Sequence, residues 1–216
     1  MNKPGIYTPV LCNQVSVQYF PCNRNRDNLY AILTFFIVLQ FLFSNQLHAD
    51  TYAVTAYGAV MSGAPLDEII TMSADYDRDY YFSALAIARK IGEYKNDIDI
   101  ELEGQFVRHS GRQHYHEYNA LIIGRWWFPS IKQADYSVAI GEGLSYADEI
   151  SEIEALHHSK TSRLLDYLLF EFTFSIPETE SWHGSVRIHH RSGIYGLFHD
   201  VHGASNALGL GVRYQF

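Results

Sequence analysis

Apolar and polar residues alternate with a period of two near the C-terminus, a pattern typical of β-strands. Between residues 182 and 192 the even-numbered positions are apolar until the run ends in His190 and Ser192, whereas the odd-numbered positions are polar. A second alternating run covers residues 208–216 and ends in an aromatic residue, Phe216. The two runs predict a β-hairpin with one apolar and one polar face, joined by residues 194–206.

The same rhythm recurs upstream and predicts six further strands. They are expected at residues 51–61, 80–92, 97–106, 115–128, 136–147 and 164–175. Short turns near residues 94–96, 129 and 177 would then alternate with mostly longer loops at 62–79, 107–114, 148–162 and 193–206; residues 68–73 are compatible with a strand extension. Short turns on one side and longer loops on the other are typical of outer-membrane barrels. We therefore expect an all-β chain that forms an eight-stranded antiparallel transmembrane β-barrel.

The predicted strand 97–106 has the cleanest alternation, with four acidic residues on one face: Asp97, Asp99, Glu101 and Glu103. Carboxylates on a shared face need water or basic partners. The inner wall of a small barrel that carries Arg187 and Arg213 could supply both, and the solvated face of a soluble sheet is the alternative. Side chains fill the interior of an eight-stranded barrel, so a passive pore is not expected.

An apolar run at residues 29–43 follows Arg24 and Arg26 and precedes polar and small residues that end at Ala49. The run is too short for a spanning helix, which needs about 20 apolar residues. Its order of charged, apolar and small residues is typical of a secretory signal. We expect residues 1–49 to be a leader that is cleaved after Ala49, and residues 50–216 to be one exported domain. An uncleaved inner-membrane anchor is the alternative.

The composition of the chain limits which cofactors and partners it can have. Both cysteines, Cys12 and Cys22, lie in the predicted leader, so the exported part would have neither a disulfide nor a cysteine-ligated metal. The formal net charge of −8 is a poor match for nucleic acid, which we exclude as a partner. Aromatic residues make up 15% of the chain, and the segment 126–128 is compatible with an interfacial aromatic belt.

Two residues of the apolar face, His190 and Ser192, could carry chemistry. They lie near the predicted outer end of their strand, where a polar residue facing lipid costs little stability. A serine beside a histidine can act as an activated nucleophile. Ser192 would then attack an ester whose acyl chain lies in the lipid beside the barrel. The alternative is that both are polar rim residues without a catalytic role.

The sequence His190-Arg191-Ser192 at the outer end of the penultimate strand, on an exported eight-stranded barrel with an aromatic C-terminus, resembles the outer-membrane lipid A 3-O-deacylase (PagL) family. The resemblance implies a serine esterase in the outer membrane that removes the 3-linked acyl chain from lipid A. It implies a His-x-Ser pair assisted by a glutamate, without a metal or other cofactor. Lipid A, or lipopolysaccharide, and the membrane would be the partners, and a homodimer is compatible with the sequence.

The chain departs from the family pattern at two positions. The family has Asn directly after the Ser, near the oxyanion hole, whereas this chain has Gly193, whose backbone N–H could still serve. The family glutamate would fall near Asn206, which can accept a proton from an imidazole but carries no full charge. Asp200 in the last loop and Asp166 in the strand 164–175 are the alternatives for the third member. Asp166 would face lipid beside the histidine.

The remaining candidate functional residues are the histidines of the loops and one glutamate. Histidines of mobile loops are usually solvated, so we expect no metal at His199, Asp200 and His202 or at the pair His157 and His158. Glu142, which lies between two glycines, is assigned no role. Two other functional classes stay open: a non-catalytic outer-membrane barrel with a structural or loop-mediated binding role, and a soluble periplasmic lipid-binding barrel.

Overall fold

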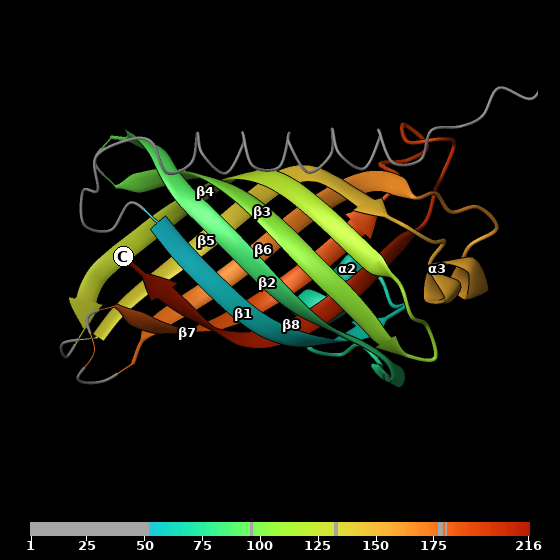
Figure 1. The fold of residues 1–216 in the computed structure, drawn as a ribbon, viewed down its shortest axis with the longest axis horizontal. Helices are drawn as coiled ribbons and strands as arrows, with labels where there is room; N and C mark the ends of the chain where they lie inside the picture. Colours follow the sequence, from blue (N-terminus) through green and yellow to red (C-terminus); the bar gives the residue numbers. More distant parts are fainter. Residues whose placement is uncertain (1–51, 96, 132–133, 177–178, 180) are drawn as a thin grey trace, which may run out of the picture. The chain divides into compact units, whose positions relative to one another are not determined.

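The computed structural model describes residues 52–95, 97–131, 134–176, 179 and 181–216, and these form an antiparallel barrel closed by pairing of the first and last strands (Figure 1). The predicted leader, residues 1–49, lies outside the described residues. The eight strands are β1 (Tyr52–Ser62), β2 (Asp77–Tyr94), β3 (Ile98–Gly111), β4 (His116–Ile131), β5 (Ala134–Ala147), β6 (Leu164–Ser175), β7 (Trp182–Ser192) and β8 (Ala204–Gln215). Two short helices, α2 (Leu66–Ile70) and α3 (Glu152–His157), lie in loops.

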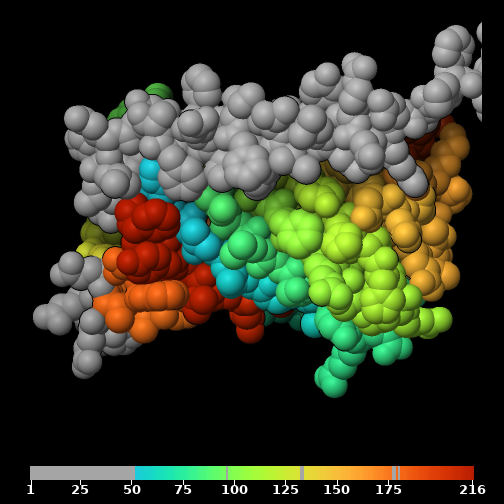
Figure 2. All heavy atoms as spheres, viewed as in Figure 1, coloured from blue at the N-terminus to red at the C-terminus, as the bar shows by residue number. Residues whose placement is uncertain are grey.

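The alternation predicted from the sequence separates an apolar outer face from a polar interior. On β7 the odd-numbered residues from His183 to Arg191 are buried, and the even-numbered residues face outward. Large apolar side chains are exposed on other strands, including Ile122 at 58%, Ile140 at 57% and Leu210 at 67%. Figure 2 shows side chains of β1, β2 and β3 as a continuous layer on the visible surface. Such an outer face fits a bilayer rather than water.

Buried ion pairs fill the interior. Arg187 Nη1 lies 2.8 Å from Glu103 Oε1, and Arg213 Nη2 lies 2.7 Å from Glu101 Oε1. Arg125 Nε lies 2.9 Å from the same Glu101 oxygen. Of the two alternatives for the acidic face of the third strand, the inner wall of the barrel holds for Glu101 and Glu103, whereas Asp97 is exposed before β3 and Asp99 pairs with Lys90. Side chains occupy the lumen at this level, as the size of an eight-stranded barrel requires.

Several predicted boundaries are wrong. The third strand continues to Gly111, because β2 begins at Asp77 and pairs with β3 as far as Tyr80 opposite Gly111. The fourth strand does not turn at Pro129 but continues to Ile131. The register with β5 shifts between Phe128 and Ile131, and such a bulge tolerates a proline.

Two further corrections affect the loops. The last strand begins at Ala204 rather than at residue 208, so that the predicted 13-residue connection 194–206 is shorter and Asn206 belongs to β8. Residues 66–70 form α2 instead of a strand extension, because Pro65 precedes the helix and the amide N–H groups of Glu68 and Ile69 both donate to its carbonyl.

Both helices lie at the end of the barrel opposite the C-terminus (Figure 1). Outer-membrane barrels have short periplasmic turns and longer extracellular loops, so we assign this end to the cell exterior. Arg191, an inward-facing residue of β7, donates to Glu154 Oε1 of α3 at 2.6 Å and to the carbonyl of Arg163 at 2.7 Å. The loop between β5 and β6 is thereby fastened to the end of β7. Among the described residues, no helix has the length and apolar character needed to cross a membrane.

Candidate active site

His190 and Ser192 lie on the outer face of β7, at its extracellular end. Both are partly exposed, whereas their neighbours His189 and Arg191 are buried in the lumen. Two residues on one face of a strand are separated by about 6.6 Å along the strand. The structure has no hydrogen bond between these two described side chains, so they share a face of the strand without being bonded to each other.

Asn206 holds the ring of His190. Its Oδ1 lies 2.6 Å from His190 Nδ1, and its Nδ2 donates to the carbonyl oxygen of Ala64 at 2.7 Å. Because the amide nitrogen needs an acceptor and finds it in Ala64, the amide oxygen faces the ring and accepts a proton from Nδ1. His190 therefore carries its proton on Nδ1, and the lone pair of Nε2 is directed away from Asn206. This is the tautomer that a general base needs.

The local sequence explains why these groups meet. Asn206 is the cross-strand partner of His190 on one side and of Ser62 on the other. The Ser62 hydroxyl accepts from the N–H of Ala64 at 3.0 Å and donates to the carbonyl of Asp75 at 2.6 Å. Ser62 thus turns the chain at the end of β1 so that the Ala64 carbonyl covers Asn206, which is only 1% exposed although it lies on the outer face.

Asp166 belongs to the same polar patch from the other side. It lies directly opposite Ser192 in the pairing of β6 with β7, while Leu168 is the residue opposite His190. The prediction that Asp166 faces outward therefore agrees with the structure, but its cross-strand partner is the serine. The residue that accepts the hydrogen bond from the His190 ring is Asn206 and not Asp166.

Glu142 is the residue of the patch that the sequence analysis missed. It lies on the outer face of β5 between Ile140 and Leu144, which are both exposed. Leu168 of β6 pairs with Glu142 on one side and with His190 on the other, so that Glu142 and His190 lie two strands apart on the same face. The signal was present in the sequence, since Glu142 has the parity of the apolar positions of its strand. An ionisable residue on a lipid-facing surface is a functional candidate by default.

Two predicted site residues are engaged elsewhere. Asp200 forms an ion pair with Lys160 and a 3.3 Å contact with His202 Nε2, so it is not the partner of His190. The hydrogen bond and charge of the Lys160 ammonium lower the pKa of Asp200. The Gly193 N–H donates to the carbonyl of Gly203 at 3.2 Å and is not free to bind an oxyanion.

The close approach of Val201 explains why Gly193 departs from the family pattern. A Cβ atom at Gly193 would clash with the Val201 carbonyl oxygen. The turn that follows is tight, because Ile194 and Tyr195 both have positive φ angles, of 45° and 51°. An asparagine could not stand at position 193 without a different loop.

The loop histidines serve mainly as internal contacts. His157 Nδ1 bonds to the carbonyl of Ile153 at 2.8 Å, and His158 Nε2 lies 2.7 Å from the carbonyl of Ala204. His199 Nδ1 lies 3.2 Å from Ser162 Oγ. In the part of the chain that the structure describes, no group of three or more His, Cys, Asp or Glu residues is arranged to hold a metal ion.

The closed sheet, its exposed apolar face and its charged interior define the chain as an eight-stranded outer-membrane β-barrel. On its lipid-facing surface, the site brings together His190, Ser192 and Asn206, with Asp166 and Glu142 beside them. The outer membrane is therefore the location of the protein.

Comparison with known proteins agrees with this class. The fold is similar to that of the outer-membrane enzyme PagL, with a TM-score of 0.55 and 10% sequence identity over 76% of this chain and 99% of PagL. Neisserial surface protein A (NspA) gives a TM-score of 0.49 and 13% identity, over 79% of this chain and 100% of NspA. The N-terminal β-barrel domain of Pseudomonas aeruginosa OprF gives 0.46 and 12%, over 78% of this chain and 98% of that domain.

No family model and no curated protein matches the chain. At 10% identity the likeness to PagL establishes the fold and nothing more. Because one barrel fold carries many unrelated functions, the activity has to be argued from the site itself.

Proposed function

We propose that the protein is a serine esterase that hydrolyses an acyl ester of lipid A in the outer leaflet of the outer membrane. The observation that supports this proposal is the 2.6 Å hydrogen bond from His190 Nδ1 to Asn206 Oδ1. It sets the imidazole as an acceptor on Nε2, on the face of the strand that carries Ser192.

In the proposed reaction Ser192 Oγ attacks the ester carbonyl while His190 Nε2 takes the hydroxyl proton. The tetrahedral intermediate collapses to an acyl-enzyme, and His190 returns the proton to the leaving alcohol. A water molecule, deprotonated by the same nitrogen, then releases the fatty acid and restores Ser192. Asn206 keeps the ring in position during both steps.

The environment of the imidazole differs from that in a Ser-His-acid triad. Asn206 is neutral and cannot balance the positive charge that His190 acquires during attack. In our proposal the carboxyl groups of Glu142 and Asp166, on the side of the ring away from Asn206, supply the missing negative charge. The arrangement of the sheet supports this role, since Asp166 lies opposite Ser192 and Glu142 lies beyond Leu168 on the same face as His190.

The position of the patch suits a membrane lipid as the substrate. Ser192 is the last residue of β7 at the extracellular end, whereas exposed apolar residues such as Ile140 and Phe172 lie deeper on the same side. An acyl chain can lie along these residues while its ester reaches Ser192 at the level of the headgroups. A water-soluble ester would gain nothing from this arrangement.

The test is the mass of lipid A from cells that express the protein. We expect wild-type protein to remove one acyl chain from lipid A, and Ser192→Ala and His190→Ala to leave the lipid unchanged. Ser83→Ala is the matched control, because Ser83 is an exposed serine on the outer face of β2, far from β7 in the strand order. Intact lipid A with the wild type, or equal deacylation by Ser192→Ala, would refute the esterase.

A non-catalytic barrel that binds through its loops is the second candidate. The observation in its favour is the hydrogen bond from Gly193 N–H to Gly203, which occupies the donor expected for an oxyanion. Under this alternative His190 and Asn206 only fasten the first loop to the barrel. His190→Ala would then loosen that loop without changing any lipid.

A further inference from the structure

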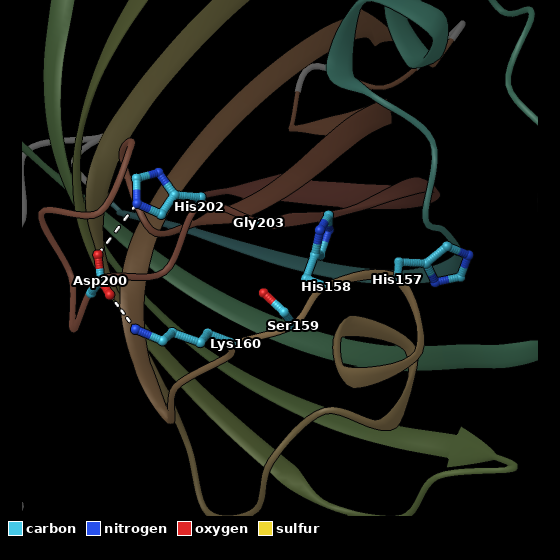
Figure 3. A pocket seen from close by; sticks show the side chains of 7 residues that line it. All are labelled: His157, His158, Ser159, Lys160, Asp200, His202 and Gly203. Atoms are coloured by element: carbon cyan, nitrogen blue, oxygen red, sulfur yellow. Dashed lines mark hydrogen bonds and ion pairs between the residues drawn. The ribbon is translucent and has the colours of Figure 1, made fainter.

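A pocket of about 400 Å³ lies between the loop that joins β5 to β6 and the loop that joins β7 to β8 (Figure 3). Its volume falls within the usual range for small-molecule sites, which is about 300–1,000 Å³. The pocket is at the extracellular end of the barrel and has a polar lining. Nothing in the proposed esterase reaction uses it.

On one side of the pocket the Asp200 carboxylate lies between a lysine ammonium and a histidine ring. Lys160, from the loop between β5 and β6, and His202, from the loop between β7 and β8, both contact Asp200 (Figure 3). A lysine ammonium has three donors, so Lys160 keeps two N–H groups for a ligand after it has bonded to Asp200. The low pKa of Asp200, caused by Lys160, keeps this bridge in place. Asp200 therefore positions the cation.

The floor of the pocket connects it to the candidate active site. Gly203 lines the pocket, and a Cβ atom there would overlap the ring of His158. The next residue, Ala204, contacts His158 Nε2 through its backbone N–H and carbonyl and is the cross-strand partner of Ser192. Paired residues of antiparallel strands are about 5 Å apart. The backbone of Ser192 thus lies one residue and one strand spacing from the lining of the pocket, roughly 9 Å away.

We propose that this pocket binds the phosphate group of a lipid headgroup whose acyl ester is presented to Ser192; the inference rests on the esterase proposal for the identity of that lipid. Nitrogen and hydroxyl donors from Lys160, His202 and Ser159 surround the space, and the single carboxylate is already shared by two of them. Phosphate is recognised by donors of this kind.

The test measures binding rather than hydrolysis, and uses the Ser192→Ala protein in detergent micelles so that no substrate is consumed. Isothermal titration with glucosamine 1-phosphate is compared with titrations with glucosamine and with inorganic phosphate. We expect glucosamine 1-phosphate to bind at least 10-fold more tightly than either. Equal binding of glucosamine would overturn the phosphate assignment. Equal binding of inorganic phosphate would overturn the headgroup assignment.

Two variants separate a ligand contact from a structural role. Lys160→Ala and Asp200→Asn break the same ion pair, so a purely structural role predicts that both weaken binding equally. We expect Lys160→Ala to weaken binding of glucosamine 1-phosphate at least 10-fold, and Asp200→Asn to weaken it less, because Asp200 only positions the ammonium that contacts the ligand. Lys95→Ala, in the turn at the opposite end of the barrel, is the matched control and should change nothing. Equal losses in the first two variants would overturn the proposal.

This experiment also separates the two proposals from each other. If the wild-type protein does not deacylate lipid A in cells but the Ser192→Ala protein binds glucosamine 1-phosphate, the esterase is refuted and the phosphate site stands. Deacylation in cells together with no binding by the Ser192→Ala protein would refute the phosphate site alone.

Discussion

At the scale of single residues, the group that orients the His190 ring is an amide. Asn206 accepts from Nδ1 and donates to Ala64, and both bonds are needed to fix which end of the amide faces the ring. A carboxylate would accept from the ring more strongly, but it could not donate to the Ala64 carbonyl. The loop that follows β1 and the ring on β7 therefore depend on the same side chain.

Substitution of Asn206 tests this role. We expect Asn206→Ala to lower kcat for lipid A deacylation by roughly 100-fold, because the imidazole loses its orienting acceptor. Asn206→Asp keeps an acceptor and should retain more activity than Asn206→Ala, although it loses the bond to Ala64. Release of fatty acid from lipid A in micelles, measured between pH 5 and pH 9, checks both variants. Equal activity of Asn206→Ala and wild type would exclude the orienting role.

Glu142 is tested through stability as well as activity. A carboxyl group on the lipid-facing surface is unfavourable, so Glu142→Leu should raise the free energy of unfolding by about 1–2 kcal/mol. The same change should lower deacylation if the carboxyl supports the His190 cation. Urea unfolding in lipid vesicles gives the first quantity. Glu93→Leu is the control, since Glu93 is paired with Lys90 near the periplasmic turn and should change stability by less than about 1 kcal/mol.

At the scale of elements, alternation in the sequence predicted the number of strands and the face of each, but not where strands end. Parity placed His190, Ser192 and Asp166 on the outer face, because a strand exposes every second residue whatever its neighbours are. The start of β8 at Ala204 depends on cross-strand pairing with β7, which no local pattern contains. The bond between Gly193 and Gly203 depends on the same register, and so the engaged oxyanion donor could not be foreseen.

The two loops that enclose the pocket respond to pH through Asp200. Its pKa is lower in the folded protein than in an unfolded chain, because Lys160 stabilises the carboxylate. The contact between the loops is therefore complete above the unfolded pKa, which is about 3.9, and is lost as the pH falls through the lower folded value. We expect the loops to separate only at a pH below the unfolded value of about 3.9, as the folded Asp200 carboxylate becomes protonated.

Limited digestion with pepsin measures this separation, because the second loop contains Leu197 and Phe198. Cleavage in that loop should increase in the wild type as the pH falls from 4 to 2. In Asp200→Asn the loop should be equally accessible at each pH, after correction for the activity of the protease on an unfolded standard. The same pH dependence in both proteins would show that another group controls the loops.

At the scale of the whole molecule, an apolar exterior and a network of buried charges depend on each other. Every inward-facing charge is held in a confined space, away from water, and must be matched. Arg187 contacts Glu103 and Glu171, and Arg125 bridges Glu171 to Glu101. These contacts join strands on opposite sides of the barrel, and the ion pairs share the interior with buried apolar residues such as Leu121, Ile123 and Leu169.

Removal of one arginine should therefore affect the entire barrel. In Arg187→Ala the carboxylates of Glu103 and Glu171 lose a shared partner inside the lumen, and uncompensated buried charges typically cost about 3–5 kcal/mol. We expect the urea midpoint in lipid vesicles to fall accordingly, with the folded and unfolded forms separated by their heat-modifiable migration on gels. Lys90→Ala removes a partly exposed lysine that pairs with Glu93 at 2.7 Å, and it should cost less than about 1 kcal/mol. Similar losses in both variants would mean that water reaches the lumen charges freely, and that the barrel is open rather than filled.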